Sequence, residues 1–329
     1  MKILITGGTG FIGTRLALKC LAQGEDVRLL GQLNSDAERQ NRLLVEREGG
    51  KFVIGSVTDN GAIDQAIDGV EIVYHLAAAQ HEANVPDQHF WDVNVEGTRN
   101  VLDASMRVGV KRFVHGSTIG VYGSAMEGEI DENTPLRPDN IYGITKSEGE
   151  KLALSYEARI PVAVVRISET YGPGDRRLLK LFKAIDKRLF FMIGKGDNKH
   201  QLIYVDDLIE GLQRAATSQK ASGQVIILAG REILTTNQIV ESLAQALGAP
   251  RQRVRMPIAP FLLFAIVLES FFRPLGVQPP LHRRRMDFFR KSFFFSRNRA
   301  REILQFEPAT SFQNGVIETV KWYKEHGYL

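Results

Sequence analysis

The chain is nearly free of cysteine, since Cys20 is the only one among its 329 residues. A single thiol excludes an internal disulfide and any metal site built on several cysteines, and no metal is expected. The N-terminal stretch "MKILITGGTG" lacks the length and the small-residue cleavage site of a signal peptide. These absences together predict a protein of the reducing cytoplasm.

A strong charge of either sign is also missing. The 42 Lys and Arg residues against 38 Asp and Glu residues give a formal net charge of only +4. So small an excess, without a recognition motif, argues against a nucleic acid partner. With 43% hydrophobic and 24% charged residues the composition is that of an ordinary globular protein, and the expected partner is a small molecule.

Long uninterrupted apolar runs are absent as well. The nearest approach is residues 258–272, which Glu269 interrupts and Arg273 and Pro274 close. A helix needs about 20 apolar residues to cross a bilayer, so no spanning segment is predicted. The run is expected to form a buried or substrate-covering helix, and a helix lying on a membrane surface is the alternative.

Short β-branched runs alternate with helical patterns in the first half of the chain, which indicates an α/β fold with helices on both faces of a parallel sheet. We predict a sheet domain over 1–170 and a smaller, mainly substrate-binding domain over 171–329, because the alternation weakens after Tyr171. The expected strands are residues 2–6, 26–31, 51–55, 71–76, 111–117 and 161–167, with a returning strand at 224–230. The expected helices include residues 11–23, 95–108 and 144–158.

The stretch "TGGTGFIG" at residues 6–13 joins the first expected strand to the first expected helix. In that context Gly7, Gly10 and Gly13 allow a sharp turn, a close approach to a pyrophosphate and tight packing of the helix on the sheet. The helix N-terminus offers free N–H groups and a positive dipole end to the anion. The turn therefore predicts a dinucleotide site in a Rossmann-type, doubly wound sheet.

Tyr142 and Lys146 stand four positions apart in "YGITK", so on a helix they project from the same face. The lysine's positive charge favours phenolate over phenol, which brings the tyrosine towards the requirements of general acid–base catalysis. Alone, the spacing is that of a solvated helix face. Beside the glycine turn and Thr118 at the end of an expected strand, it predicts proton transfer coupled to hydride transfer.

Several further motifs follow in order: "HLAA" (75–78), "NVEGT" (94–98), "GSTIGVYG" (116–123), "YGPGD" (171–175) and "YVDD" (204–207). With the glycine turn and "YGITK" they resemble the extended short-chain dehydrogenase/reductase superfamily, also called the NAD-dependent epimerase/dehydratase family. The resemblance covers nearly the whole chain. The apolar run at 258–272 and the ending "FSRNRAREILQFEP" resemble the branch of 3β-hydroxysteroid dehydrogenases, dihydroflavonol reductases and bacterial hopanoid-associated epimerase-like proteins.

The resemblance implies roles for individual residues. Tyr142 would be the acid/base, Lys146 its partner and a ligand of the nicotinamide ribose, and Thr118 the hydroxyl that binds the substrate oxygen. It implies a homodimer formed through helices like 95–108 and 144–158. The implied cofactor contacts are Gly7, Gly10, Phe11, Ile12, Gly13, Gly31, Ser56, Val57, Leu76, Ala77, Ala78, Asn94, Tyr142, Lys146 and Ile167.

The choice between NAD and NADP depends on the end of the second strand. NAD-dependent members usually carry an acidic residue there for the ribose 2′-hydroxyl, and this chain has Gly31. Without that carboxylate a 2′-phosphate is not repelled, and Arg28, Arg39 or Arg42 could receive it. The sequence leans slightly to NADP. After the third strand the usual Gly-Asp is Gly55-Ser56, which leaves a neutral contact for the adenine.

The family resemblance leaves the reaction open. Dehydratases typically follow the catalytic threonine with Asp-Glu, whereas Ile119 and Gly120 stand here, so a 4,6-dehydratase is disfavoured. Nucleotide-sugar enzymes typically carry Asn and Arg where this chain has Glu169 and His200, and a carboxylate facing a diphosphate is unfavourable. Arg285, next to Arg284, lies where such enzymes hold the diphosphate.

Three functions are therefore weighed. The first is an NAD(P)-dependent oxidoreductase or epimerase of the extended short-chain type, acting on a nucleotide-linked sugar. The second is a dehydrogenase or reductase like those of the hydroxysteroid and dihydroflavonol branch, with the apolar run covering an apolar substrate. The third is a regulator that binds dinucleotide without turning it over, which loss of Tyr142 or Lys146 would have favoured.

Overall fold

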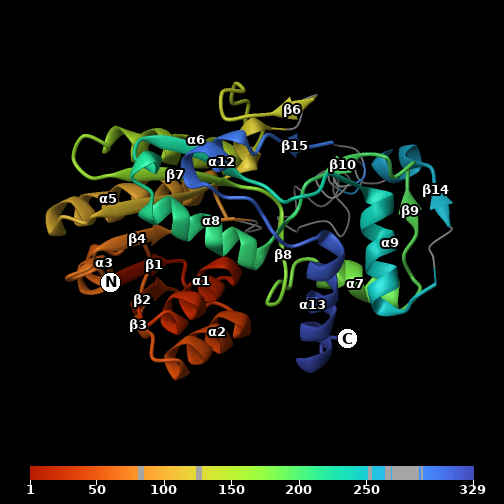
Figure 1. The fold of residues 1–329 in the computed structure, drawn as a ribbon, viewed down its shortest axis with the longest axis horizontal. Helices are drawn as coiled ribbons and strands as arrows, with labels where there is room; N and C mark the ends of the chain where they lie inside the picture. The colour runs from red at the N-terminus through yellow and green to blue at the C-terminus, as the bar shows by residue number, and fades with distance from the viewer. Residues whose placement is uncertain (81–84, 124–127, 251–253, 264–267, 269–288, 290–291) are drawn as a thin grey trace.

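The computed structural model describes residues 1–80, 85–123, 128–250, 254–263, 268, 289 and 292–329. Its larger part is a seven-stranded sheet in the order β12-β7-β5-β4-β1-β2-β3, and every neighbouring pair is parallel (Figure 1). The strands are β1 (Lys2–Thr6), β2 (Asp26–Gly31), β3 (Lys51–Ile54), β4 (Ile72–His75), β5 (Arg112–Thr118), β7 (Val162–Ile167) and β12 (Gln224–Leu228).

These strands form where the sequence has continuous β-branched runs, because both faces of the sheet are covered and both sets of side chains are buried. The order of the strands reverses between β1 and β4. In open sheets of this kind the crevice at the carboxyl ends of such neighbouring strands is where ligands bind. The glycine turn, the "HLAA" loop and Thr118 all lie at these carboxyl ends.

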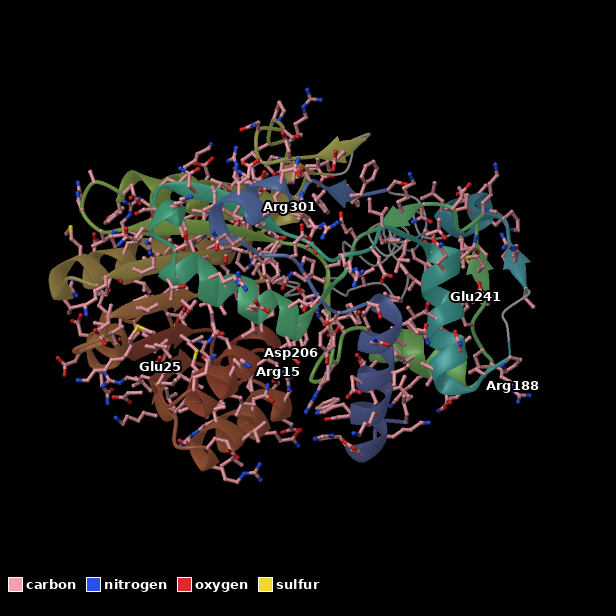
Figure 2. The ribbon with its side chains drawn as sticks, viewed as in Figure 1. Arg15, Glu25, Arg188, Asp206, Glu241 and Arg301 are labelled. Carbon is pink, nitrogen blue, oxygen red and sulfur yellow. The ribbon has the colours of Figure 1, made fainter. Side chains whose placement is uncertain are left out.

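Helices cover the two faces separately. One apolar core joins the sheet to α1, α2, α8 and α12, and a second joins it to α3, α5 and α6. Arg15 of α1 and Asp206 of α8 form an ion pair of 2.6 Å across the first layer (Figure 2). The bounds are α1 (Phe11–Ala22), α2 (Asp36–Arg47), α3 (Asn60–Ile67), α4 (Asp87–Trp91), the π-helix η1 (Asp92–Glu96), α5 (Gly97–Val108), α6 (Ile141–Ser155), α8 (Val205–Thr217) and α12 (Asn298–Leu304).

A smaller lobe gathers at the other end of the molecule around a third core from α7, α9 and α13 (Figure 1). Its helices are α7 (Leu179–Asp186), α9 (Thr236–Leu247) and α13 (Phe312–Glu325), and short 3₁₀ turns η2 (Ile119–Tyr122) and η3 (Gln219–Ala221) lie nearer the sheet. Outside the large sheet there are four pairs of two-residue strands among the described residues. They are β6 (Glu129–Ile130) with β15 (Phe294–Phe295), β8 (Thr170–Tyr171) with β11 (Ile203–Tyr204), β9 (Met192–Ile193) with β14 (Arg255–Met256), and β10 (Lys199–His200) with β13 (Leu234–Thr235).

The apolar run 258–272 is described only in part. Residues 258–263 are helical, with Ile258 and Phe261 packed against Ile193. Leu263, in contrast, is 65% exposed, so the described first part is only partly buried. The rest of the run, on which the expectation of a buried or substrate-covering helix also depends, lies outside the described residues except for residue 268. Across the described residues, no helix combines the length and the apolar character that a membrane span requires.

Candidate active site

The glycine turn closes tightly against the sheet. Gly7 has φ +67°, and a Cβ on it would lie 2.8 Å from the backbone nitrogen of Ala77. A Cβ on Gly13 would lie 2.4 Å from the carbonyl oxygen of Gly7. Gly10 is the N-cap of α1 and provides no side-chain acceptor, so the first N–H groups of the helix remain available to an anion.

A cavity of about 800 Å³ runs from this turn along the carboxyl ends of the strands. Its volume is within the usual range of small-molecule and cofactor sites. Of the residues that the sequence singled out, the structure brings fifteen to its wall: Gly7, Gly10, Phe11, Ile12, Gly13, Gly31, Ser56, Val57, Leu76, Ala77, Ala78, Thr118, Tyr142, Lys146 and Ile167.

Tyr142 lies in the first turn of α6, which begins at Ile141 because the Asn140 side chain caps it by accepting the Gly143 N–H at 3.0 Å. The sequence had predicted a start at residue 144, which would have put the tyrosine outside the helix. Lys146 follows one turn later, as the pairing argument requires. The helix thus presents both side chains to the cavity.

Thr118 ends β5 on the other side of Tyr142. Its Oγ1 accepts the Gly120 N–H at 3.0 Å. A Cβ placed on Gly120 would lie 3.4 Å from Thr118 Oγ1 and 3.9 Å from Tyr142 Cε1, so the two side chains flank the same glycine. A substrate oxygen entering here would meet a hydroxyl and a phenol together.

Lys146 is only 1% exposed, and its Nζ donates to the Gly116 carbonyl at 2.7 Å. Burial lowers the pKa of this lysine from 10.5 to about 8, against a smaller opposing effect of the Glu150 carboxylate. At pH 7 the group is still cationic. A cation held in a site with little water acts more strongly on a neighbouring phenol than the same charge in solvent.

A buried polar network supports the strand that carries Thr118, and sequence reasoning missed it. Ser117 donates its hydroxyl to Glu150, which forms an ion pair with Arg166 at 2.8 Å. Arg166 also donates to the Tyr122 hydroxyl at 2.7 Å. Glu150 lies one turn beyond Lys146, so the i+4 spacing was a signal that could have drawn attention to it.

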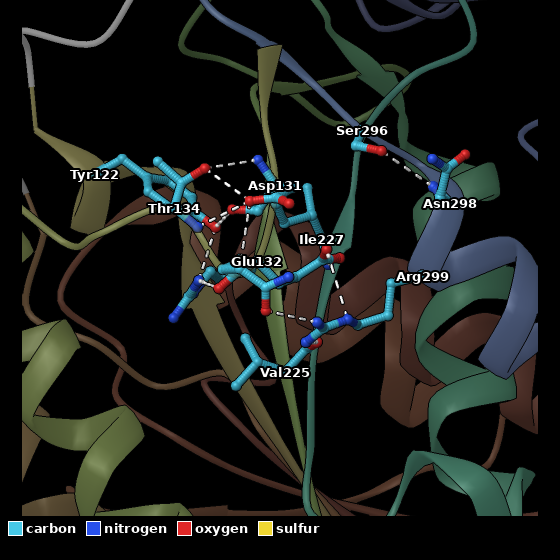
Figure 3. Close-up of polar contacts among 11 residues, drawn as sticks. Tyr122, Asp131, Glu132, Thr134, Val225, Ile227, Ser296, Asn298 and Arg299 are labelled. Carbon is cyan, nitrogen blue, oxygen red and sulfur yellow. Dashed lines mark hydrogen bonds and ion pairs between the residues drawn. The ribbon is translucent and has the colours of Figure 1, made fainter.

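The network continues outward to the C-terminal part of the chain (Figure 3). The Tyr122 hydroxyl donates to the Asp131 carbonyl at 2.8 Å. The neighbouring Glu132 accepts the Ile227 N–H at 2.8 Å and lies 3.7 Å from Arg299 of α12. The edge strand β12 and the helix α12 are thereby tied to the segment that follows Thr118.

Asn94 is completely buried in η1 and does not line the cavity. The resemblance had grouped it with the cofactor contacts and had also implied a structural hydrogen-bonding role near the site. Its side chain accepts the Ala79 N–H at 2.8 Å and donates to the Ala79 carbonyl at 3.2 Å and to Thr145 Oγ1 at 3.0 Å. Asn94 therefore connects Ala79, directly after the "HLAA" motif, to α6 on the side away from the cavity.

Besides Thr118, the sequence proposed Glu169, His200 and Arg285 as substrate contacts, and the structure describes the first two of these three. Glu169 and His200 form a pair, with 3.3 Å between Glu169 Oε2 and His200 Nδ1. The His200 side chain is buried, whereas that of Glu169 is 48% exposed. Neither lines the cavity, but Ser168 and Thr170 on both sides of Glu169 do. Arg285 and Arg284 lie outside the described residues.

The adenosine end of the cavity lacks the arginines that the sequence offered for a 2′-phosphate. Arg28 donates to carbonyls at the end of α3, at 2.8 Å from Ala66 O, while Arg39 pairs with Asp36 and Arg42 with Glu46. None of the three lines the cavity. The wall near Gly31 is instead made by four polar residues that were not predicted, Thr9, Gln32, Asn34 and Glu38.

Other ionisable residues of the wall were also missed. His89 and Asp92 come from α4 and η1 and line the cavity with the "HLAA" loop. Arg177 lines it from the smaller lobe, held by Asp175 at 3.0 Å and by the Thr170 carbonyl at 2.6 Å. His89 and Asp92 stand in helical segments of five residues each and Arg177 stands in a loop. Segments this short carry no periodic pattern, so the sequence offered no signal for these residues.

Comparison with known proteins gives a family match over residues 3–229, to the NAD dependent epimerase/dehydratase family. The chain therefore belongs to that family, which is the extended short-chain dehydrogenase/reductase class that the motifs predicted. A dTDP-glucose 4,6-dehydratase of Streptomyces niveus is 29% identical over 99% of this chain and 94% of its own. A sterol demethylase protein B of Methylococcus capsulatus is 29% identical over the whole of both chains.

Solved structures share the fold over nearly the whole chain. The UDP-glucuronic acid 4-epimerase of Bacillus cereus, solved with NAD, has a TM-score of 0.79 at 24% identity over 99% of both chains. A dTDP-glucose 4,6-dehydratase of Streptomyces venezuelae, solved with NAD bound, has a TM-score of 0.76 at 26% identity over 99% of this chain and 97% of its own. The fold agrees with the sequence prediction. The family is described as NAD dependent, which fits the predicted nicotinamide dinucleotide but gives no support to the lean towards NADP.

The prediction that a 4,6-dehydratase is disfavoured was wrong. Besides the Streptomyces niveus enzyme, two more dTDP-glucose 4,6-dehydratases, from Actinoplanes sp. and Streptomyces griseus, are 30% identical over 98% of this chain. The argument had considered only Ile119 and Gly120, the positions directly after Thr118. Asp92 and His89 also line the cavity, so the lack of an acidic pair at one place does not leave the site without ionisable groups.

Proposed function

We propose that this protein oxidises a secondary alcohol of a nucleotide-linked sugar with NAD, as an epimerase or a dehydratase. The observation that carries the proposal is the meeting of Thr118, Tyr142 and Lys146 in the same cavity as the glycine turn. Inverting a carbon that bears a hydroxyl, or eliminating water beside it, becomes feasible once that carbon is oxidised to a ketone. Both reactions therefore need the same initial proton and hydride removal.

The residues divide the work as follows. The Thr118 hydroxyl binds the substrate oxygen, and the Tyr142 phenol exchanges a proton with it. Lys146, fixed to the Gly116 carbonyl at 2.7 Å, stabilises the phenolate by its charge. The glycine turn and the Ser56–Val57 loop hold the dinucleotide, whose nicotinamide takes up the hydride when it is bound.

NAD is the proposed cofactor rather than NADP. The lean to NADP depended on Arg28, Arg39 and Arg42, and all three are engaged away from the cavity. Glu38 lines the wall near Gly31, and a carboxylate there would repel a 2′-phosphate. The quenching of protein fluorescence measures the affinities for NADH and NADPH separately. A higher affinity for NADPH would contradict the assignment.

Support for a nucleotide-linked sugar comes from the relatives. They include dTDP-glucose 4,6-dehydratases, whose named substrate is nucleotide-linked. A 4-epimerase of N-acetylglucosaminyl diphosphate linked to undecaprenol, from Escherichia coli O157:H7, is 30% identical over 78% of this chain and 75% of its own. Its substrate is also a sugar diphosphate, but it carries a lipid in place of the nucleoside. The residues 171–329 would contribute most substrate contacts, as the smaller lobe borders the cavity through Arg177. A cytoplasmic location and a homodimer through α5 and α6 stay proposals, and sedimentation at micromolar concentration tests the dimer.

An apolar substrate is the second candidate, and Glu169 favours it. Its half-exposed carboxylate stands beside two cavity residues, where a diphosphate would experience repulsion. The relatives also include the sterol demethylase protein B of Methylococcus capsulatus. A hydroxyl on an apolar ring system would meet Thr118 and Tyr142 without bringing a second negative charge to Glu169.

To test the proposed function, the purified protein is incubated with NAD and one of three candidate substrates: dTDP-glucose, UDP-glucuronic acid or a 3β-hydroxysteroid. Absorbance at 340 nm follows NADH, and NMR identifies the product as an epimer, a keto-deoxy sugar or a ketosteroid. Tyr142→Phe should lower turnover at least about a thousandfold, the upper range expected for loss of an acid/base group, with NAD affinity nearly unchanged. Tyr328→Phe, near the C-terminus, is the matched control. Retained turnover in Tyr142→Phe would overturn the assignment.

A further inference from the structure

Exposed apolar side chains cluster at the end of the smaller lobe, around the pair β9–β14. Leu189 is 71% exposed, Leu263 65% and Val254 61%, and Met256 and Phe191 are 42% and 37% exposed. We call these five residues the β9–β14 face. They account for five of the thirteen large exposed hydrophobic residues among the described part of the chain, so the apolar surface is concentrated here rather than scattered.

The structure holds these residues together from three separate segments. The Met192 N–H donates to the Val254 carbonyl at 2.9 Å, which aligns the strand after Phe191 with the one after Val254. The rings of Phe191 and Phe261 have centroids 5.6 Å apart, so the helical residues 258–263 join the same surface. The face is thus a built part of the fold and not the loose end of one loop.

Basic residues accompany the apolar ones. Residues 187–195 and 254–263 contain Lys187, Arg188, Lys195 and Arg255 and no acidic residue, and all four are exposed. Arg188 lies at the end of the molecule farthest from the large sheet (Figure 2). Arg255 is fixed by donating to the Lys195 carbonyl at 2.7 Å.

Two acidic residues flank the first of these segments in the sequence. Asp186 precedes Lys187, and Asp197 follows Lys195. The two carboxylates leave a net positive charge over 186–197 and 254–263, since these ranges hold the four basic residues against two acidic ones. A second copy of the chain docked here would bring like charges together, whereas an anionic surface would meet opposite ones.

We propose that the β9–β14 face docks on an anionic lipid bilayer. Apolar side chains next to lysine and arginine are the combination that binds a membrane interface, because the first enter the acyl boundary while the second contact acidic headgroups. The attachment is peripheral and reversible. It does not depend on which substrate the cavity binds.

The experiment measures cosedimentation of the full chain with vesicles. Vesicles of phosphatidylcholine with phosphatidylglycerol should bind the protein, vesicles of phosphatidylcholine alone at least about tenfold less, and added salt should release it because exposed charges are screened. The double variant Leu189→Ser/Leu263→Ser should bind the anionic vesicles at least about tenfold less. Lys187→Glu/Arg188→Glu should show a loss of similar size and a weaker salt effect.

The matched control is Leu43→Ser/Ile54→Ser, since these residues are 64% and 61% exposed on the large sheet domain. It should bind vesicles as the unaltered protein does, and all variants should keep the NAD affinity of the cavity. Absence of binding to anionic vesicles at low salt would overturn the proposal. Equal losses of vesicle binding in the control and in the Leu189→Ser/Leu263→Ser variant would also overturn it. A third contrary result would be a protein that does not bind vesicles but forms a concentration-dependent dimer which this variant abolishes.

Discussion

Replacing Lys146 by methionine should stabilise the dinucleotide-free protein while abolishing its activity. The side chain is 1% exposed, and burial lowers its pKa from 10.5 to about 8. One pKa unit corresponds to 1.36 kcal/mol, so holding the charged form at neutral pH costs about 3 kcal/mol. Methionine has a similar length and carries no charge, and it fills such space readily.

One interaction opposes this gain. Methionine cannot donate to the Gly116 carbonyl, which the lysine does at 2.7 Å, and losing a hydrogen bond typically costs about 1 kcal/mol. The net expectation at pH 7 is therefore a free energy of unfolding about 2 kcal/mol higher for Lys146→Met. Turnover should vanish, because the phenolate of Tyr142 loses its cationic partner.

The pH dependence gives the sharper test. Folding lowers the pKa of this lysine. Between about pH 8 and 10.5 the unfolded chain therefore still holds a proton that the folded chain has released. The unaltered protein therefore gains stability as pH rises through that window, and the variant lacks this gain. The difference between them should be constant below about pH 8 and shrink by about 3 kcal/mol towards pH 10.5.

Urea unfolding followed by circular dichroism at several pH values between 7 and 10 measures both quantities. Lys151→Met is the control, since this lysine of the same helix is exposed and pairs with Glu148. It should change stability by less than about 1 kcal/mol. A Lys146→Met protein that is less stable at pH 7, or a difference that does not change with pH, would refute the view that the fold bears a cost for a buried cation.

Two other predictions concern the turn and the network. Gly13→Ala should weaken NAD binding at least about tenfold and lower the free energy of unfolding by about 1–3 kcal/mol, because its Cβ would lie 2.4 Å from a carbonyl oxygen of the turn. Titration with NADH measures the affinity. A loss of affinity no larger than that of Gly61→Ala would contradict the prediction. Glu150→Gln should cost about 3–5 kcal/mol in urea unfolding, since it leaves Arg166 buried without a carboxylate. A cost no larger than that of Glu148→Gln, on the exposed side of the same helix, would show that the pair contributes little.

Most of the large sheet could be predicted because its strands are buried on both faces. Their continuous apolar runs place all seven strands within two residues of the observed bounds. The start of α6 was missed by three residues, because the side chain of Asn140 caps the helix and the apolar period begins only later. The glycine turn and "YGITK" were found because each depends on spacing along one element.

What the sequence could not provide depends on contacts between distant segments. Ser117, Glu150 and Arg166 belong to β5, α6 and β7, and nothing in any one of these segments indicates their partners. The two-residue strands of the smaller lobe are too short for a periodic pattern. Arg28 was considered as a phosphate ligand because it shares the second strand with Gly31. Successive residues of a strand face opposite sides, however, and Arg28 points to the end of α3.

The substrate end of the site follows the same logic. Glu169 and His200 were noted separately as departures from a family pattern, and the structure brings them within 3.3 Å of each other. His200 also contacts Asn198 and Thr236, at 2.9 and 3.1 Å from its Nε2, so the imidazole orients the carboxylate beside Ser168 and Thr170. Glu169 and His200, the two departures from the family's pattern for a diphosphate site, thus form one polar pair. Neither side chain lines the cavity, whereas Ser168 and Thr170 do, so the pair acts on a bound substrate through these two neighbours.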